Sequence, residues 1–206
     1  MNPDLVFILP VLLFSVVVHE YAHGWMAKRC GDMTAELSGR LTFNPIPHID
    51  PIGTILVPII LSLTPGNFFI AWAKPVPVNP MNFRNPGLDN VKVSGAGPLS
   101  NIILAVICRI LLEFFSFGLI YGILSYAVAI NILLAVFNMV PIHPLDGSHI
   151  LEYYIPYNFK ETYHRFQSVA PFILLLLIFT QLLWVIITPI YSFVYNFIDI
   201  LVGIFF

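Results

Sequence analysis

The chain of 206 residues is far more apolar than a water-soluble domain. Hydrophobic side chains make up 58% of it and charged side chains 10%, against roughly 25% charged residues in a typical soluble domain, and the mean hydropathy is +0.88. Nine Lys and Arg against eleven Asp and Glu leave a net charge of −2, with no basic stripe for nucleic acid. The composition excludes soluble, disordered and nucleic-acid-binding proteins and indicates an integral protein of the lipid bilayer.

Long apolar stretches predict the transmembrane helices, because one span needs about 20 apolar residues. The last stretch is long enough for two helices, and we predict that Thr188 and Pro189 divide it. The expected fold is an all-α polytopic membrane protein with about five transmembrane helices. The stretches cover residues 5–27, 95–117, 120–140 and 169–206.

We expect residues 1–206 to form a single domain, in which residues 5–147 make the core and residues 169–206 make the C-terminal helices. The multi-pass arrangement leaves no soluble domain beside the apolar stretches.

Three shorter segments do not read as transmembrane helices. Residues 50–62 are apolar but short and rich in proline, which predicts a re-entrant segment. Residues 31–44 alternate in a pattern that predicts a small membrane-associated β-hairpin, whose edge is available to pair with an extended substrate. Residues 65–90 are dense in Pro, Gly and Asn and predict an irregular loop that is interfacial or re-entrant.

The basic residues predict the orientation of the chain. They fall between the first and second long stretches and again before the C-terminal stretch, and cytoplasmic loops carry the excess of Lys and Arg. We therefore expect the N-terminus outside and residues 50–62 to dip into the membrane and return. The residues concerned are Lys28, Arg29, Arg40, Lys74, Arg84, Lys92, Lys160 and Arg165.

Arg109 and Glu113 lie four residues apart inside an apolar stretch. An unpaired charge there is costly, so we expect an ion pair within the helix rather than part of a substrate channel.

The first stretch ends in the pattern His19-Glu20-Tyr21-Ala22-His23. On a helix, residues i and i+4 share one face, so both imidazoles can hold one metal ion while the intervening Glu20 stands beside the water that the metal activates. Two histidines and a glutamate near the end of an apolar helix are expensive unless they serve a function. The pattern predicts a zinc-dependent peptidase, with Glu20 as the catalytic residue.

A catalytic zinc site takes three protein ligands, so a third donor must come from elsewhere. The best candidate is Asp146, which follows the prolines that end the stretch 120–140 and precedes Gly147. In the predicted orientation, Asp146 and the two histidines lie at the same inner side of the membrane. His143 and His149 flank Asp146 and remain open alternatives, and the role of His48 is also open.

Five blocks resemble the site-2 protease family of intramembrane zinc metalloproteases, in its small form that consists of little more than the catalytic core. The resemblance covers nearly the whole chain, and the blocks follow the family's order. They are HEYAHG at 19–24, NPIPHIDPIGT at 44–54, WAKPVPVNP at 72–80, GAGPLSN at 95–101 and NMVPIHPLDG at 138–147.

The resemblance implies one Zn²⁺ per chain held by His19, His23 and Asp146, and Glu20 as general base and acid. It also implies that Asn138, Pro141 and Pro144 contact the substrate. The family's small forms often carry a proline where this chain has His143. The implied substrate is a single-span membrane protein, cut within or near its transmembrane segment in regulated intramembrane proteolysis.

Three rival functions remain open at this stage. A membrane peptidase of another family would take a glutamate as third zinc ligand, for which the chain offers Glu113, Glu152 and Glu161. A metal transporter would need polar residues along several helices, and only Arg109 and Glu113 qualify. A haem protein would need histidines on facing helices, whereas this pair lies on one helix.

Overall fold

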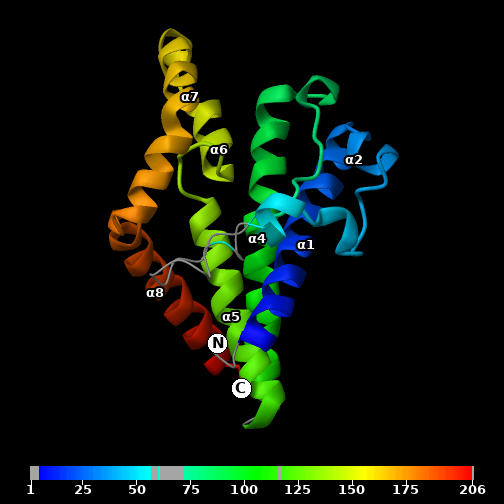
Figure 1. Ribbon diagram of the computed structural model, residues 1–206, viewed down its shortest axis with the longest axis vertical. Helices are drawn as coiled ribbons and strands as arrows, with labels where there is room; N and C mark the ends of the chain where they lie inside the picture. Colours follow the sequence, from blue (N-terminus) through cyan, green and yellow to red (C-terminus); the bar gives the residue numbers. More distant parts are fainter. Residues whose placement is uncertain (1–4, 57–59, 61–71, 116, 206) are drawn as a thin grey trace.

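The computed structural model describes residues 5–56, 60, 72–115 and 117–205, and within these ranges the regular structure is helical, without strands (Figure 1). Five helices are long and apolar enough to cross a membrane. The chain is thus an all-α, multi-pass integral membrane protein. The long helices are α1 (Leu5–Cys30), α4 (Pro86–Leu112), α5 (Gly118–Asn138), α7 (Tyr157–Phe179) and α8 (Leu182–Gly203).

Helices α1, α4 and α5 pack side by side and form the centre of the molecule (Figure 1). Small residues let their backbones approach closely, as in other membrane bundles. Ala105 of α4 and Ile132 of α5 are fully buried in the shared apolar core, which also includes Ile187 of α8. These three helices provide a rigid frame on which polar side chains can be placed.

The short helix α6 (Asp146–Tyr154) follows α5 after a turn. It packs against α4, and Tyr163 of α7 donates a hydrogen bond of 2.8 Å to the carbonyl of Ser148. In Figure 1, α7 descends from the top of the view towards the left, and α8 then descends towards the right, to the C-terminus. The two C-terminal helices therefore follow one another end to end instead of folding back as a hairpin.

The predicted β-hairpin at 31–44 is wrong. Residues Thr34–Leu37 form the short helix α2, and Gly39 follows with φ of +68°. Asp32 accepts hydrogen bonds from the backbone N–H and the hydroxyl of Thr34, which turns the chain into a helical bend. This local capping overrides the alternating pattern, so the segment offers no strand edge to a substrate.

Two boundaries differ from the prediction. Helix α4 begins at Pro86, nine residues before 95, because the helix continues beyond the apolar stretch and Asp89 accepts the backbone N–H of Asn85. The C-terminal break lies at Thr180 and Gln181 rather than at Thr188 and Pro189. Gln181 has φ of +61° and ends the regular helix, whereas Pro189 lies inside α8, as transmembrane helices tolerate.

Of the predicted re-entrant segment 50–62, the structure describes residue 60 and residues 50–56, which include a helical turn at Pro51–Leu56 (η2). The rest lies outside the described residues, so the re-entrant path stays a prediction. In the predicted loop 65–90, residues 72–79 are extended without regular structure, and a 3₁₀ turn at Pro80–Asn82 (η3) precedes α4.

The expected ion pair between Arg109 and Glu113 is confirmed. The guanidinium also donates to Asp199 of α8 over 2.7 Å, a partner 90 residues away that spacing cannot reveal. The three charges thus connect α4 to α8.

Candidate metal centre

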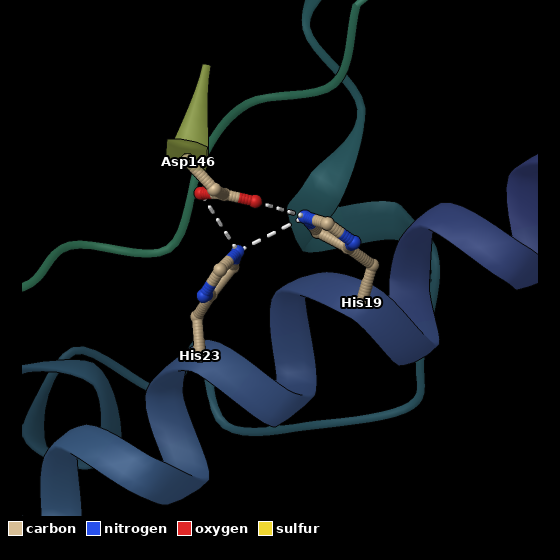
Figure 2. Close-up of side chains that lie close together, drawn as sticks. All are labelled: His19, His23 and Asp146. Carbon is tan, nitrogen blue, oxygen red and sulfur yellow. Dashed lines mark hydrogen bonds and ion pairs between the residues drawn. The ribbon is translucent and has the colours of Figure 1, made fainter. Parts of the chain in front are cut away.

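Helix α1 presents His19 and His23 on one face, one helical turn apart (Figure 2). Their Nε2 atoms lie 2.9 Å from each other, and the rings stand nearly perpendicular with centroids 4.6 Å apart. His19 is buried and His23 is half-buried. The pair is therefore arranged as two nitrogen donors directed at one point.

Asp146, the first residue of α6, reaches the same point from the opposite side (Figure 2). Its Oδ2 lies 3.2 Å from His19 Nε2, and its Oδ1 lies 3.4 Å from His23 Nε2. Among the described residues, these three form the one group of His, Cys, Asp or Glu side chains close enough to share a metal ion. Sequence-distant α1 and α6 thus bring together the three predicted ligands.

The remaining nitrogens of the histidines determine which ring atom carries the proton. His19 Nδ1 lies 2.6 Å from Asn101 Oδ1, and His23 Nδ1 lies 2.7 Å from the carbonyl of Val93. Both partners are acceptors, so Nδ1 must be the donor in each neutral ring. Nε2 then carries a lone pair, the form in which imidazole binds a metal.

Three electron-rich atoms therefore meet at contact distance, and Asp146 Oδ2 is buried without a hydrogen bond from the described residues. A carboxylate binds a metal in its ionised form, and an imidazole in its neutral form. Two imidazoles and a carboxylate fit a zinc ion.

Gly97 of α4 lies directly over the two imidazoles. A Cβ atom at this position would stand 2.4 Å from His23 Nε2 and 2.6 Å from His19 Nε2. Only glycine permits α4 to approach the ligands this closely. A second close approach occurs at Gly147, where a Cβ would meet the carbonyl oxygen of Met139 at 2.2 Å, so the turn before α6 also requires glycine next to Asp146.

Glu20 contacts the extended segment 72–79. Its Oε2 accepts a hydrogen bond of 2.7 Å from the backbone N–H of Val76. Pro75 and Pro77 have no N–H, so Val76 supplies the one amide donor of this Pro-Val-Pro run. The segment thereby fixes the carboxylate of Glu20 through the backbone.

The extended segment is itself held by two buried charged residues. Arg40 donates to the carbonyls of Lys74 and Pro75 over 2.7 and 3.2 Å. Asp32, which is fully buried, accepts the backbone N–H of Asn79 at 2.7 Å. Burial raises the pKa of Asp32, but its hydrogen bonds, the largest from the Thr34 side chain, hold the pKa below its ordinary value. Sequence reasoning missed both residues.

The predicted substrate contacts are not joined to the ligand cluster by any hydrogen bond within the described residues. Asn138, the last residue of α5, donates from its amide to the carbonyl of Leu134 at 2.9 Å in its own helix. Pro141 and Pro144 are exposed in the turn between α5 and α6.

The open histidines take other positions. His48 is fully buried and lies 3.0 Å from the carbonyl of Thr42. His143 and His149 pack edge to face with centroids 5.8 Å apart. None of the three belongs to the ligand group found among the described residues.

The rival glutamate ligands also have other partners. Glu113 pairs with Arg109, Glu161 with Arg165, and Glu152 lies 3.7 Å from His164. The ligand set with a glutamate in third place is therefore not formed in this fold.

Comparisons with known proteins agree with this geometry. A family model described as "Peptidase family M50" matches residues 116–180. "Putative zinc metalloprotease YwhC" of Bacillus subtilis is 38% identical over 187 residues, which cover 85% of this chain and 81% of the relative. "Putative zinc metalloprotease Rip2" of Mycolicibacterium smegmatis is 30% identical over 152 residues, covering 71% of this chain and 57% of the relative. No solved structure gives a significant match. On the extent of these matches, the chain belongs to peptidase family M50, the site-2 protease family.

Proposed function

We propose that this chain is an intramembrane zinc metalloprotease that hydrolyses a peptide bond within or near the transmembrane segment of a single-span membrane protein. One Zn²⁺ per chain is held by His19, His23 and Asp146, and residues 1–206 act as one domain. Membership of a peptidase family and the names of its zinc metalloprotease relatives support the metal and the reaction. The assignment of the ligands rests on the geometry of this chain.

One observation carries the proposal: both imidazoles keep Nδ1 occupied by an acceptor, so two nitrogen lone pairs and one carboxylate converge from α1 and α6. Without a cation these atoms would repel one another at 2.9 to 3.4 Å. A structural ion pair would need only one histidine. The second histidine is expected if the site serves a metal.

The residues then divide the work of peptide hydrolysis. Zinc bound here supplies a Lewis acid that lowers the pKa of water towards about 7 and polarises the scissile carbonyl. Glu20, next in sequence to His19, takes the proton of the attacking water as its oxygen bonds to the carbonyl carbon. Glu20 returns that proton to the amine nitrogen when the C–N bond breaks. No covalent bond to the protein is required.

The hydrogen bond from Val76 supports this role because it orients the carboxylate without using its charge. The backbone amide bonds to Oε2, which leaves Oε1 available to take the proton. Substrate contacts through Asn138, Pro141 and Pro144 belong to the same proposal, and Asn138 must exchange its bond to Leu134 to make one.

We also propose that the site lies near the cytoplasmic side and that the N-terminus lies outside. Lys28 and Arg29 end α1 just beyond the histidine pair, and basic residues favour the cytoplasmic side. The Lys28→Cys variant should react with an impermeant maleimide only after the cells are permeabilised. Labelling of intact cells would reverse the orientation.

The proposed activity is tested with the purified full chain in lipid nanodiscs and a panel of single-span substrates. The Glu20→Gln variant should bind zinc like the wild type but cleave about 10²- to 10⁴-fold more slowly, the usual contribution of a general base. A chelator should abolish wild-type cleavage, and added zinc should restore it.

The matched control is Glu36→Gln, which replaces a half-buried glutamate outside the ligand cluster that pairs with Lys28 at 2.6 Å. Its cleavage rate should equal that of the wild type. Cleavage that survives both Glu20→Gln and the chelator would show that the chain is not a zinc peptidase of this kind.

A further inference from the structure

A chain of buried hydrogen bonds begins at His19 and runs away from the metal site into the bundle. Asn101 of α4 and Asn131 of α5 are fully buried, with 0% of their surface accessible, and Ser15 of α1 is 1% accessible. Amides buried at membrane depth are expensive unless each donor and acceptor is used. These side chains connect three different helices, and the mechanism described above uses none of them directly.

The bonds have a definite direction, which can be followed from the far end. The Ser15 hydroxyl donates to the carbonyl of Val11 at 2.8 Å, so its oxygen is left as an acceptor. The amide nitrogen of Asn131 donates to that oxygen at 2.8 Å and to the carbonyl of Ala127 at 2.8 Å. With both amide hydrogens used, Asn131 must offer Oδ1 to its next neighbour.

That neighbour is Asn101, whose amide nitrogen donates to Asn131 Oδ1 at 2.8 Å and to the carbonyl of Ser15 at 3.2 Å. Its own Oδ1 therefore points to His19 Nδ1 at 2.6 Å. A reversed Asn101 amide would place its oxygen against two other oxygens. The orientation of Asn101 is thus determined by groups that never touch the metal site.

We infer that Asn131 and Ser15 are positioning residues for the metal centre: they hold the Asn101 amide so that His19 carries its proton on Nδ1 and offers Nε2 to the ion. His19 and Ser15 are one turn apart on α1, so the same helix both supplies the ligand and anchors the far end of the chain. Because Asn131 lies on α5, the packing of α1, α4 and α5 is coupled directly to the chemistry of one imidazole. This inference rests on the proposed function, since it assigns residues to the same zinc site.

The test compares variants of the full chain in nanodiscs by zinc affinity, measured through chelator competition, and by the visible spectrum of the cobalt-substituted protein, which reports ligand geometry. Asn101→Leu should weaken zinc binding about 10- to 100-fold, as expected for loss of a hydrogen bond to a metal-ligating histidine. Asn131→Leu should weaken it about tenfold, at the lower end of that range, and shift the cobalt bands.

A rescue variant separates positioning from stability. Asn131→Asp keeps an oxygen that accepts from Asn101, and in its protonated form it also donates to Ser15 or Ala127. It should bind zinc as tightly as the wild type and keep the cobalt spectrum. Equal losses in Asn131→Leu and Asn131→Asp would show that Asn131 serves only the packing and would overturn the inference.

Ser15→Ala provides a second route if Asn131→Leu does not fold. Its matched control is Ser125→Ala, because the Ser125 hydroxyl makes the same bond to the carbonyl four residues earlier, Tyr121, at 2.8 Å on the exposed surface of α5. Ser15→Ala should lower zinc affinity and Ser125→Ala should not. Equal affinities in the two variants would contradict the inference.

The result is distinguishable from a failure of the proposed function. If the wild type binds no zinc, or binds it equally well without His23, the ligand assignment itself fails. If the wild type binds one zinc that depends on His19, His23 and Asp146, while Asn131→Leu and Ser15→Ala bind it unchanged, only the positioning role fails.

Discussion

The N-terminal half of the molecule (α1, α4 and α5) and its C-terminal half (α7 and α8) are adapted to lipid in opposite ways. In α1, α4 and α5, polar side chains are buried and joined to one another, as Asn101 and Asn131 illustrate. In α7 and α8, large apolar side chains face outwards, with Phe172 and Val185 73% and 71% exposed. In the most apolar 18-residue stretch of each helix, 33% of the residues are buried in α4 and in α5, against 17% in α7 and in α8.

The difference shows that apolarity alone does not identify the functional half of a membrane protein. Lipid tails solvate Phe172 as well as a protein core does, so α7 and α8 need few internal contacts. Polar groups in the bilayer must instead find partners within the protein. A cluster of buried polar groups directed at one point, as around His19, therefore marks the candidate functional site.

The sharpest way to break this comparison is to remove the proposed ligand on α6. Asp146→Ala should abolish retention of zinc through purification and with it all cleavage, because only two protein donors remain. Glu152→Ala, on the same helix but without a contact to the histidines, should retain one zinc per chain. Metal analysis by mass spectrometry measures both. If Asp146→Ala retained zinc, the third ligand would have to be a residue other than Asp146.

The addition of one methyl group at Gly97 should weaken zinc binding almost as strongly. In Gly97→Ala, Cβ would stand 2.4 Å from His23 Nε2, inside the space that the ion requires. Zinc affinity should fall by at least about 10- to 100-fold, the loss seen when ligand orientation is disturbed.

Its control is Gly95→Ala on the same helix, where a Cβ meets nothing within 4 Å. That variant should bind zinc normally and gain roughly 0.5–1 kcal/mol of helix stability. Titration of both variants with a competing chelator separates the two outcomes, and equal affinities would contradict the close approach of α4.

The smallest effect is expected at the junction between the halves. Arg109→Met leaves Glu113 and Asp199 without their shared partner, and should lower the free energy of unfolding by about 1 kcal/mol, since both carboxylates are partly exposed. Zinc affinity should not change. Arg165→Met, which breaks the fully exposed pair with Glu161, should alter neither quantity. Thermal unfolding in nanodiscs, followed with zinc titration, checks this pair.

The proposed ligands were accessible to sequence reasoning because their signal is local. His19 and His23 are one turn apart, and Asp146 stands beside a glycine and prolines at the end of an apolar stretch. The long helices were likewise recognisable from apolar length. In both cases residues that are close in sequence are enough to predict the feature.

The supporting residues were not accessible, because their meaning depends on distant partners. Asn131 lies 116 residues from Ser15, and Asp32 lies 47 residues from Asn79. The hairpin prediction failed for a related reason, since one buried aspartate decides the conformation after α1. The break at Gln181 was missed because proline is the usual signal, and here a glutamine with positive φ ends the helix.

The amide of Val76, flanked by two prolines, has a consequence for how the enzyme tolerates change. The group that steadies Glu20 belongs to the main chain, so ordinary exchange of the side chain at this site leaves the contact in place. Only another proline, or replacement of the peptide link by an ester, deletes the donor. The proposed general base is therefore oriented by a main-chain group that most point mutations do not change.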